Sequence, residues 1–241
     1  MAAGCIFVIP VTGDDYLKDN IDEIEKLDFP ERLKKLVKLA HKYDKNYAVH
    51  GARGFQSCRH KYDFNPPAKT EDVRAFERDF DIKLPESFFR YLTEVGNGGA
   101  GVGYGVYNLD QIRKHNKHLL IKTKGKVIFE YENIKEKWIE FVQETDSLGD
   151  SAEDDIKYDS IVSEMLKGLL VIGTEGCTYD HVIVCEGKYK GMTGMIDWNL
   201  EEYSVPFFYG LDFESWICNH FKKIACGEVI KHREDFWTVK G

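Results

Sequence analysis

The sequence predicts an α+β fold in which helices flank a short run of antiparallel strands. In residues 30–43 and 212–226 apolar side chains recur at spacings of three and four, which is typical of amphipathic helices. Residues 169–198 instead contain short apolar runs separated by glycine-containing turns, which is typical of strands and hairpins. A hydrophobic content of 43% in 241 residues provides ample material for a core.

The N-terminal apolar run is expected to form a buried or edge strand. Ala3-Gly4-Cys5 resembles the end of a lipoprotein cleavage site, but no basic residue precedes it and the apolar run follows the cysteine. We therefore expect no export signal here. Pro30 suits the first turn of the helix at 30–43. The apolar face of this helix consists of Leu33, Leu36, Val37, Ala40 and Tyr43.

A loop and a second helix are expected next. Residues 57–69 contain two prolines and no helical period, which predicts the loop. Thr70 is placed to cap the following helix, with Glu71 and Asp72 in the first turn, where the helix dipole favours acids. The inward face of this helix is predicted to contain Val73, Phe76 and Phe80.

A glycine-rich stretch at residues 94–105 raises the question of nucleotide binding. A G-x-G-x-x-G pattern occurs at Gly96, Gly98 and Gly101. In a phosphate-binding turn a strand enters the glycines and a helix leaves them. Here Pro85 opens a helix that Gly96 ends, so the order is reversed. We predict a helix C-terminus at Gly96 and a tight turn in which Asn97-Gly98 takes positive φ.

The second half is predicted to consist of strands and a last helix. Short strands are expected at 169–172 and 182–185, with a hairpin turn and a return strand at 192–198. Asp212 is placed to cap the final helix. The apolar face of that helix contains Phe213, Trp216, Ile217, His220, Phe221 and Ile224.

Two ordered sets of residues in this chain carry a family resemblance. The first set is Phe76-Glu77, Leu84-Pro85, Asn97-Gly98-Gly99, Gly101, Tyr104 and Gly105. The second set is Gly173, Gly176-Cys177, a strand at 181–187 and Gly191. Over about residues 49–224 the chain resembles the SUKH superfamily, specifically the SMI/KNR branch named after fungal regulators of cell-wall assembly. Two departures, Val102 at a common proline position and residues 195–198 at a commonly Val-Trp-containing strand, do not affect the predicted fold.

The resemblance implies a curved, mainly antiparallel sheet packed on helices, with no shared catalytic chemistry and no cofactor. Bacterial members are similar to immunity proteins that block a toxin, often a nuclease, and fungal members resemble signalling scaffolds. We therefore predict a non-enzymatic protein-binding module, with immunity as the leading interpretation and regulation without a toxin as the alternative. An N-terminal extension at 1–48 and a SUKH-like domain at 49–241 are predicted, with an acidic insertion at about 130–165.

The negative charge is concentrated in that insertion. Glu130–Glu164 contains 12 acids and three bases, whereas the remainder of the chain is nearly neutral within a total net charge of −8. This balance argues against nucleic acid as a partner. Such a charge run is usually a solvated face or mobile loop. As a functional feature it would present carboxylates to a basic protein, such as a toxin domain. The acids expected to bind this partner are Asp150, Glu153, Asp154, Asp155 and Asp159.

Aromatic side chains are the predicted anchors for the same partner. Tyr104 lies in the glycine turn, and Trp198 and Trp237 are not constrained by any helical pattern. Trp216, by contrast, lies on a helical apolar face and is predicted to be core.

Catalytic and metal sites are weakly supported. Three Cys/His pairs, Cys58/His60, Cys177/His181 and Cys218/His220, lack the C-x-x-C spacing of a strong zinc site. Cys177, Asp180 and His181 are too close in sequence for a hydrolytic triad, since triads gather from separate elements. We expect Cys177 to be a small buried thiol. His181 is expected at the entrance of a strand and Asp180 in the turn before it, with loop hydrogen bonds to both. No run is long enough to span a membrane and the cysteines are sparse, so a cytoplasmic location is expected.

Overall fold

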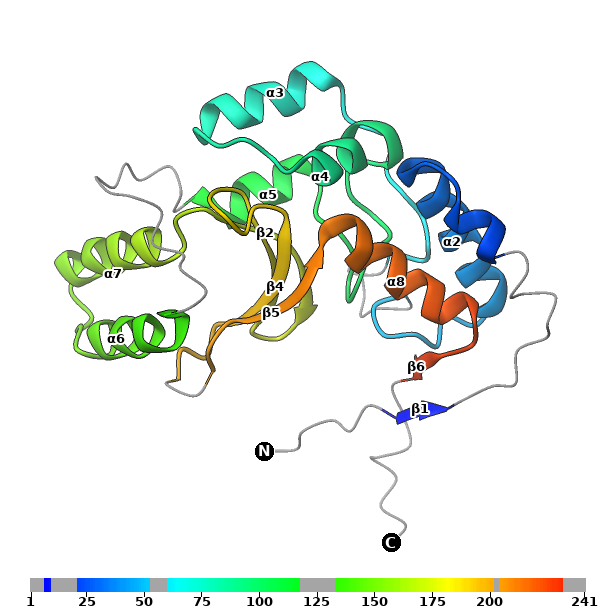
Figure 1. Cartoon of the computed structure of the whole chain (residues 1–241). Coiled ribbons are helices and arrows are strands. Elements are labelled where there is room, and N and C mark those ends of the chain that lie inside the picture. Colours follow the sequence, from blue (N-terminus) through cyan, green and yellow to red (C-terminus); the bar gives the residue numbers. More distant parts are fainter. Residues whose placement is uncertain (1–6, 10–20, 53–59, 118–132, 202–203, 232–241) are drawn as a thin grey trace, which may run out of the picture.

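A computed structural model of the chain describes residues 7–9, 21–52, 60–117, 133–201 and 204–231 (Figure 1). The helices are α2 (Phe29–Tyr43), α3 (Thr70–Asp79), α4 (Glu86–Arg90), α5 (Leu109–His115), α6 (Ile134–Asp146), α7 (Ala152–Met165) and α8 (Phe213–Ala225), and a π-helical turn, η1 (Tyr91–Val95), continues α4. The strands are β1 (Phe7–Ile9), β2 (Leu169–Gly176), β3 (Tyr179–Val184), β4 (Met192–Asp197), β5 (Phe207–Asp212) and β6 (Val229–Lys231). The predicted α+β class is confirmed.

Strands β2 to β5 form an open antiparallel sheet in sequence order, so that β2 and β5 are its outer strands. The strands predicted at 169–172, 182–185 and 192–198 are confirmed. Strand β5 was not predicted, because Gly210 and the mixed polarity around it break the apolar pattern. At the N-terminus β1 pairs with β6, which confirms the expected strand there.

Side chains alternate between two apolar cores on the two faces of the sheet. On one face Leu170, Ile172 and Ile183 join a core built with α2, α3, η1 and α8. On the other face Val171, Val182 and Val184 pack with α6 and α7. The sheet is therefore covered by helices on both sides, as Figure 1 shows with α6 and α7 lying apart from α8.

The N-terminal helix α2 packs along α8, and both contribute to the same core. Phe29, Leu33 and Ala40 of α2 are at most 2% exposed. Pro30 lies in the first turn, as predicted. The division into an extension at 1–48 and a domain at 49–241 stays a prediction. Within the described ranges, no helix has the length and apolar character needed to cross a membrane.

The described part of the acidic segment, residues 133–165, contains a pair of helices, α6 and α7, and is not a loop. Trp138, Phe141 and Val162 are at most 6% exposed and fill the core between α6, α7 and the sheet. The Trp138 indole N–H also donates to the backbone oxygen of Glu201 at 3.0 Å. The sequence obscured these helices because the charged outward faces dominate the composition, while the apolar positions are few.

Helix α3 begins one residue earlier than predicted. Thr70 is its first helical residue, the N-cap is Lys69, and no side chain caps the helix, so the predicted Thr70 cap is wrong. Glu71 and Asp72 do lie in the first turn. The inward positions Val73, Phe76 and Phe80 are buried, as predicted.

The glycine turn follows the π-helical end of α4. Gly96 ends this helix, as predicted, with an extended φ of −176°. Glycine is required at this position by space, because a Cβ would lie 2.8 Å from both the Asn65 backbone oxygen and the Phe64 Cβ. Positive φ begins at Gly98 (80°) and continues at Gly99 (113°), and Asn97 does not share it.

Candidate protein-interaction surface

The glycine turn closes one edge of the sheet. The Tyr104 N–H donates to the Thr174 oxygen and the Tyr107 N–H to the Ile172 oxygen, both at 2.8 Å, and Val106 bridges to Gly173. The turn therefore runs beside β2 in the way a further strand would. This explains why the two glycine-containing signatures, about 70 residues apart in the sequence, belong to one structural unit.

Within this unit the sheet edge fixes the position of Tyr104. The Tyr104 ring is half-buried, with its centroid 5.2 Å from that of His50, and it lies directly against Gly176, where any Cβ would collide with it. The structure thus brings Tyr104 together with Gly176 of the second signature. A role for Tyr104 in partner binding stays a prediction.

Next to Tyr104 a carboxylate lies between two histidines. Glu175 Oε2 is 3.2 Å from His50 Nε2, and Glu175 Oε1 is 3.0 Å from His181 Nε2. Burial alone would raise the pKa of Glu175, but the contacts with His181 and His50 outweigh it and lower that pKa to about 2. The hydrogen bond with Glu175 raises the pKa of His50.

This cluster joins three elements that are distant in sequence. His50 follows α2, Glu175 ends β2 and His181 lies in β3 with 1% exposure, its ring 5.0 Å from that of Trp216 on α8. Sequence reasoning missed the cluster, because 125 residues separate His50 from Glu175 and no local pattern marks the pair. Its evident role is to fasten the β2–β3 hairpin to the segment after α2.

The first signature is held by one buried carboxylate. Glu77 is 7% exposed and accepts hydrogen bonds from the Leu84 N–H (2.9 Å) and from Arg74 (2.5 Å), with Lys83 at 3.3 Å. Burial opposes ionisation, but these donors lower the pKa of Glu77. The Phe-Glu and Leu-Pro pairs are thus linked: Glu77 holds the backbone just before Pro85, which is the N-cap of α4.

The remaining signature residues shape the turns. Asn97 accepts a hydrogen bond from the Leu109 N–H at 2.9 Å, which ties the turn to the start of α5. A Cβ at either Gly101 or Gly105 would collide with backbone atoms of the same turn. Cys177 has φ 52° at the tip of the β2–β3 hairpin and is exposed, so the expected buried thiol is wrong: a hairpin tip projects into solvent.

The structure separates the residues of the weak catalytic alternative. Asp180 and His181 are adjacent in β3 and point to opposite faces of the sheet, Asp180 accepting a hydrogen bond from the Trp198 indole and His181 facing Trp216. Asp180 lies within β3, so its expected placement in a turn is wrong. Among the described residues, no three His, Cys, Asp or Glu side chains could hold a metal ion, and Cys58 lies outside them. Absence of a bound metal stays a prediction.

Most of the predicted acidic residues lie exposed around the start of α7. Asp150, Glu153, Asp155 and Asp159 are exposed. Asp154 differs, because its backbone N–H donates to the Ser151 hydroxyl while its carboxylate accepts a hydrogen bond from that hydroxyl at 2.6 Å. Asp154 therefore contributes to the N-terminal cap of α7, and the other four acids are presented to solvent.

The tryptophans occupy different environments. Trp216 is 7% exposed, which confirms its core position. Trp198 is half-buried, with its indole N–H bound to Asp180 at 2.9 Å, on the face of the sheet that α6 and α7 cover. Trp237 lies outside the described residues. Trp198 is thus near the acidic helices and on the opposite face from His181.

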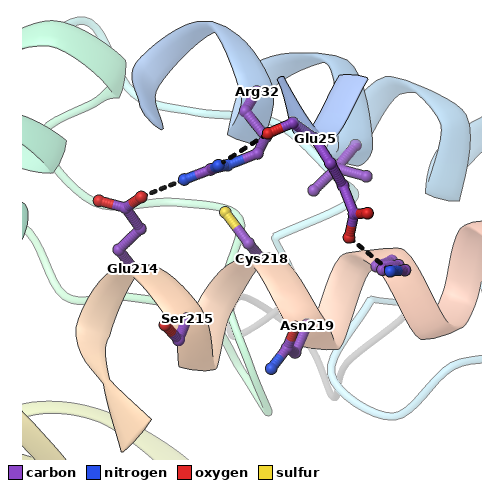
Figure 2. Close-up of a pocket in the computed structure, with 8 residues that line it drawn as sticks. Glu25, Arg32, Glu214, Ser215, Cys218 and Asn219 are labelled. Atoms are coloured by element: carbon purple, nitrogen blue, oxygen red, sulfur yellow. Dashed lines mark hydrogen bonds and ion pairs between the residues drawn. The ribbon is translucent and has the colours of Figure 1, made fainter. Parts of the chain in front are cut away.

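A polar groove of about 320 Å³ lies between α2 and α8. Figure 2 shows Arg32 reaching Glu214, with Cys218 between this ion pair and Glu25, which in turn pairs with Lys222. Burial raises the pKa of the Cys218 thiol to about 11, so the thiol is not a nucleophile at neutral pH. One ion pair connects α8 to α2, and the other connects α8 to the segment before α2. The polar residues of the groove therefore have a structural role in holding these elements together.

The comparison with protein families matches the architecture just described. A model of the SMI1/KNR4 family (SUKH-1) matches residues 67–219, from the start of α3 to the middle of α8. The chain belongs to the SMI1/KNR4 family. Membership supports a role as a protein-interaction module with a protein partner. Neither the curated proteins nor the solved structures gave a match.

Proposed function

We propose that this SMI1/KNR4 protein is a non-enzymatic immunity protein that neutralises a toxin by direct protein–protein contact. The observation that carries the proposal is the exposure of four acids around the start of α7, on a helix pair whose apolar side is already used by the sheet. Because the core fixes the helices, the carboxylates form a rigid surface. Such a surface is complementary in charge to a basic protein. Nucleases are one such class, because they bind the phosphates of nucleic acid with basic residues.

The electrostatic effect of this surface is expected mainly on association. Exposed charges interact through solvent and are screened within about 8 Å at physiological salt. They therefore raise the rate of encounter by steering and contribute less to the lifetime of the complex. The immunity function would then depend on these acids for speed and on buried contacts for affinity.

Gene context and growth give the first test of the toxin as partner. The toxin domain encoded immediately upstream is expressed with and without this chain. Immunity predicts that co-expression restores growth and that the two proteins co-purify. If no toxin gene is adjacent, or if co-expression leaves the toxin fully active, the immunity proposal is wrong and regulation is favoured.

Charge reversal tests the acidic surface itself. Asp150, Glu153, Asp155 and Asp159 are changed to Lys, and Asp154 is kept because it caps α7. We expect association with the toxin domain to slow by about tenfold or more at low salt and to lose most of its salt dependence. The matched control reverses four exposed acids far from α7, which are Asp22, Asp63, Glu71 and Glu228. Equal rates in the two variants would show that the position of the acids is irrelevant.

A further inference from the structure

Exposed apolar side chains are rare in the described part of the chain, and two of them lie on one sheet. Only Ile156, Tyr179 and Phe207 are large, apolar and exposed there, at 72%, 38% and 58%. The strand register places Phe207 opposite Met195, which is opposite His181, so these side chains share the face on which Tyr179 also lies.

The ring of Phe207 is held in place although it is exposed. It lies edge-on to Tyr209, with centroids 5.3 Å apart, and Tyr209 stacks on Trp216 of α8 at 6.0 Å. Phe207 thus continues a row of aromatic rings that begins in the core. An exposed ring positioned in this way loses little conformational freedom on binding, which is the property of an anchor residue.

Strand β5, which carries Phe207, is an outer strand of the sheet. No other strand in the described ranges pairs with the far side of β5, whereas the glycine turn covers the opposite edge along β2. Proteins usually protect outer strands with lysine or proline or by covering them. Among the described residues in and directly before β5, only Pro206, at its entrance, follows this rule.

Acidic residues lie in or near this edge in the sequence. Residues 191–221 contain no lysine or arginine, and Asp197, Glu201 and Asp212 lie in or beside β4 and β5. Glu201 is joined to the acidic insertion by the hydrogen bond from Trp138. The acceptor is the Glu201 backbone oxygen, so the bond places the loop before β5 next to α6.

We propose that the outer edge of β5 is the docking site for a basic, extended segment of the partner, which adds to the sheet as a fifth strand. Backbone hydrogen bonds would pair the segment with β5, and an apolar side chain would pack on Phe207. Lysine or arginine side chains at the alternate positions would lie on the other face of the sheet, on which the register places Asp212. A second copy of this chain is not the expected occupant, because two β5 edges would bring like charges together. This inference rests on the proposed function and names its docking site.

The test uses a short fluorescein-labelled peptide in which Lys alternates with Val and Tyr. Two comparison peptides carry Glu in place of Lys, or Pro in place of Val, which removes strand hydrogen bonds. The chain is prepared with Phe207→Ser and, as a matched control, with Ile156→Ser, which removes an exposed apolar side chain from α7. Tyr179→Ser serves as the second variant if Phe207→Ser alters the melting curve.

We expect the Lys peptide to bind with a Kd below ~1 mM and to slow hydrogen exchange in residues 207–212. Phe207→Ser should weaken binding about tenfold or more, and Ile156→Ser should not change it. The Glu and Pro peptides should not bind. No binding of the Lys peptide, equal binding to Phe207→Ser, protection outside β5, or dimerisation of the chain through β5 would each overturn the proposal.

The toxin complex separates this inference from the proposed function. If charge reversal on α7 slows association but Phe207→Ser leaves the complex unchanged, the immunity proposal stands and β5 docking is wrong. If the toxin does not bind the chain at all while the Lys peptide protects β5, the docking site stands and the toxin is not the partner.

Discussion

Lowering the pH from 7 to 4.5 is expected to remove several kcal/mol from the free energy of unfolding, because two histidines with buried Nε2 atoms are neutral in the folded chain. Burial, with a smaller contribution from His220, lowers the pKa of His60 to about 3. Burial also lowers the pKa of His220 to about 4, against the attraction of Glu175. The Nε2 atoms of both rings are buried and make no hydrogen bond with any described residue.

The direction of this stability change follows from the pKa of each histidine in the folded chain and its pKa in the unfolded chain. In the unfolded chain histidine has a pKa of about 6.5, so below that pH the unfolded state binds a proton on each of these histidines, whereas the folded state does not. Stability is therefore complete above about pH 6.5 and is lost as the pH falls towards the folded pKa. Between pH 7 and 4.5 each histidine lowers the free energy of unfolding by about 2.5 kcal/mol. This is a large part of the about 5–15 kcal/mol by which a typical protein is stable.

Neighbouring groups modify this loss without reversing it. The raised pKa of His50 stabilises the folded state as the pH falls, and so offsets part of the loss. Glu175, with a pKa near 2, keeps its stabilising charge throughout this window and loses it only at lower pH. Lys223 and His181 oppose protonation of His220. The net expectation is a loss of about 2–4 kcal/mol between pH 7 and 4.5.

Urea unfolding at a series of pH values measures the effect. His60→Gln and His220→Gln should each flatten the dependence of the unfolding free energy on pH, even where the substitution lowers stability at pH 7. His115, which is exposed and stacked on Tyr107, provides the matched control, and His115→Gln should keep the wild-type slope. The reasoning is refuted if wild type has the same unfolding free energy at pH 7 and 4.5, or if the double variant retains the full slope.

Three further predictions concern the signatures and the metal question. Gly98→Val or Gly99→Val should destabilise the fold by about 1–3 kcal/mol in thermal melts, because φ is positive and a Cβ would meet backbone atoms. Gly187→Val is the control: Gly187 has positive φ but open space around it, so this variant shows the effect of backbone strain without a collision. Unchanged melting curves for Gly98→Val and Gly99→Val would contradict the predicted turn. Glu77→Ala should cost about 1–3 kcal/mol in urea unfolding by leaving the buried Leu84 N–H without an acceptor, whereas Glu77→Gln should cost less; equal losses would mean that charge alone matters. Purified protein should contain no stoichiometric transition metal and EDTA should not shift its melting curve, and elemental analysis that finds about one zinc per chain would refute this.

Local patterns determined much of the fold. The 3.6-residue period placed α2, α3, α4 and α8, and Asp212 caps α8 through the Ser215 N–H as its sequence position predicts. The same sequence placed β2 to β4, because the apolar runs and the glycine turns between them are both local. The acids of α7 were also evident from composition, since charge in a solvated helix requires no tertiary partner.

Tertiary structure decided what these elements do together. The contact between His50 and Glu175 spans 125 residues, and Glu77 reaches the Leu84 N–H only because the chain turns back after α3. Burial of Trp138 and exposure of Phe207 depend on which face each helix covers, and no single residue type encodes that choice. The outer position of β5 depends on the order of all four strands. Periodicity thus determined the elements, because backbone conformation is local, whereas packing alone determined which side chains meet and which remain available to a partner.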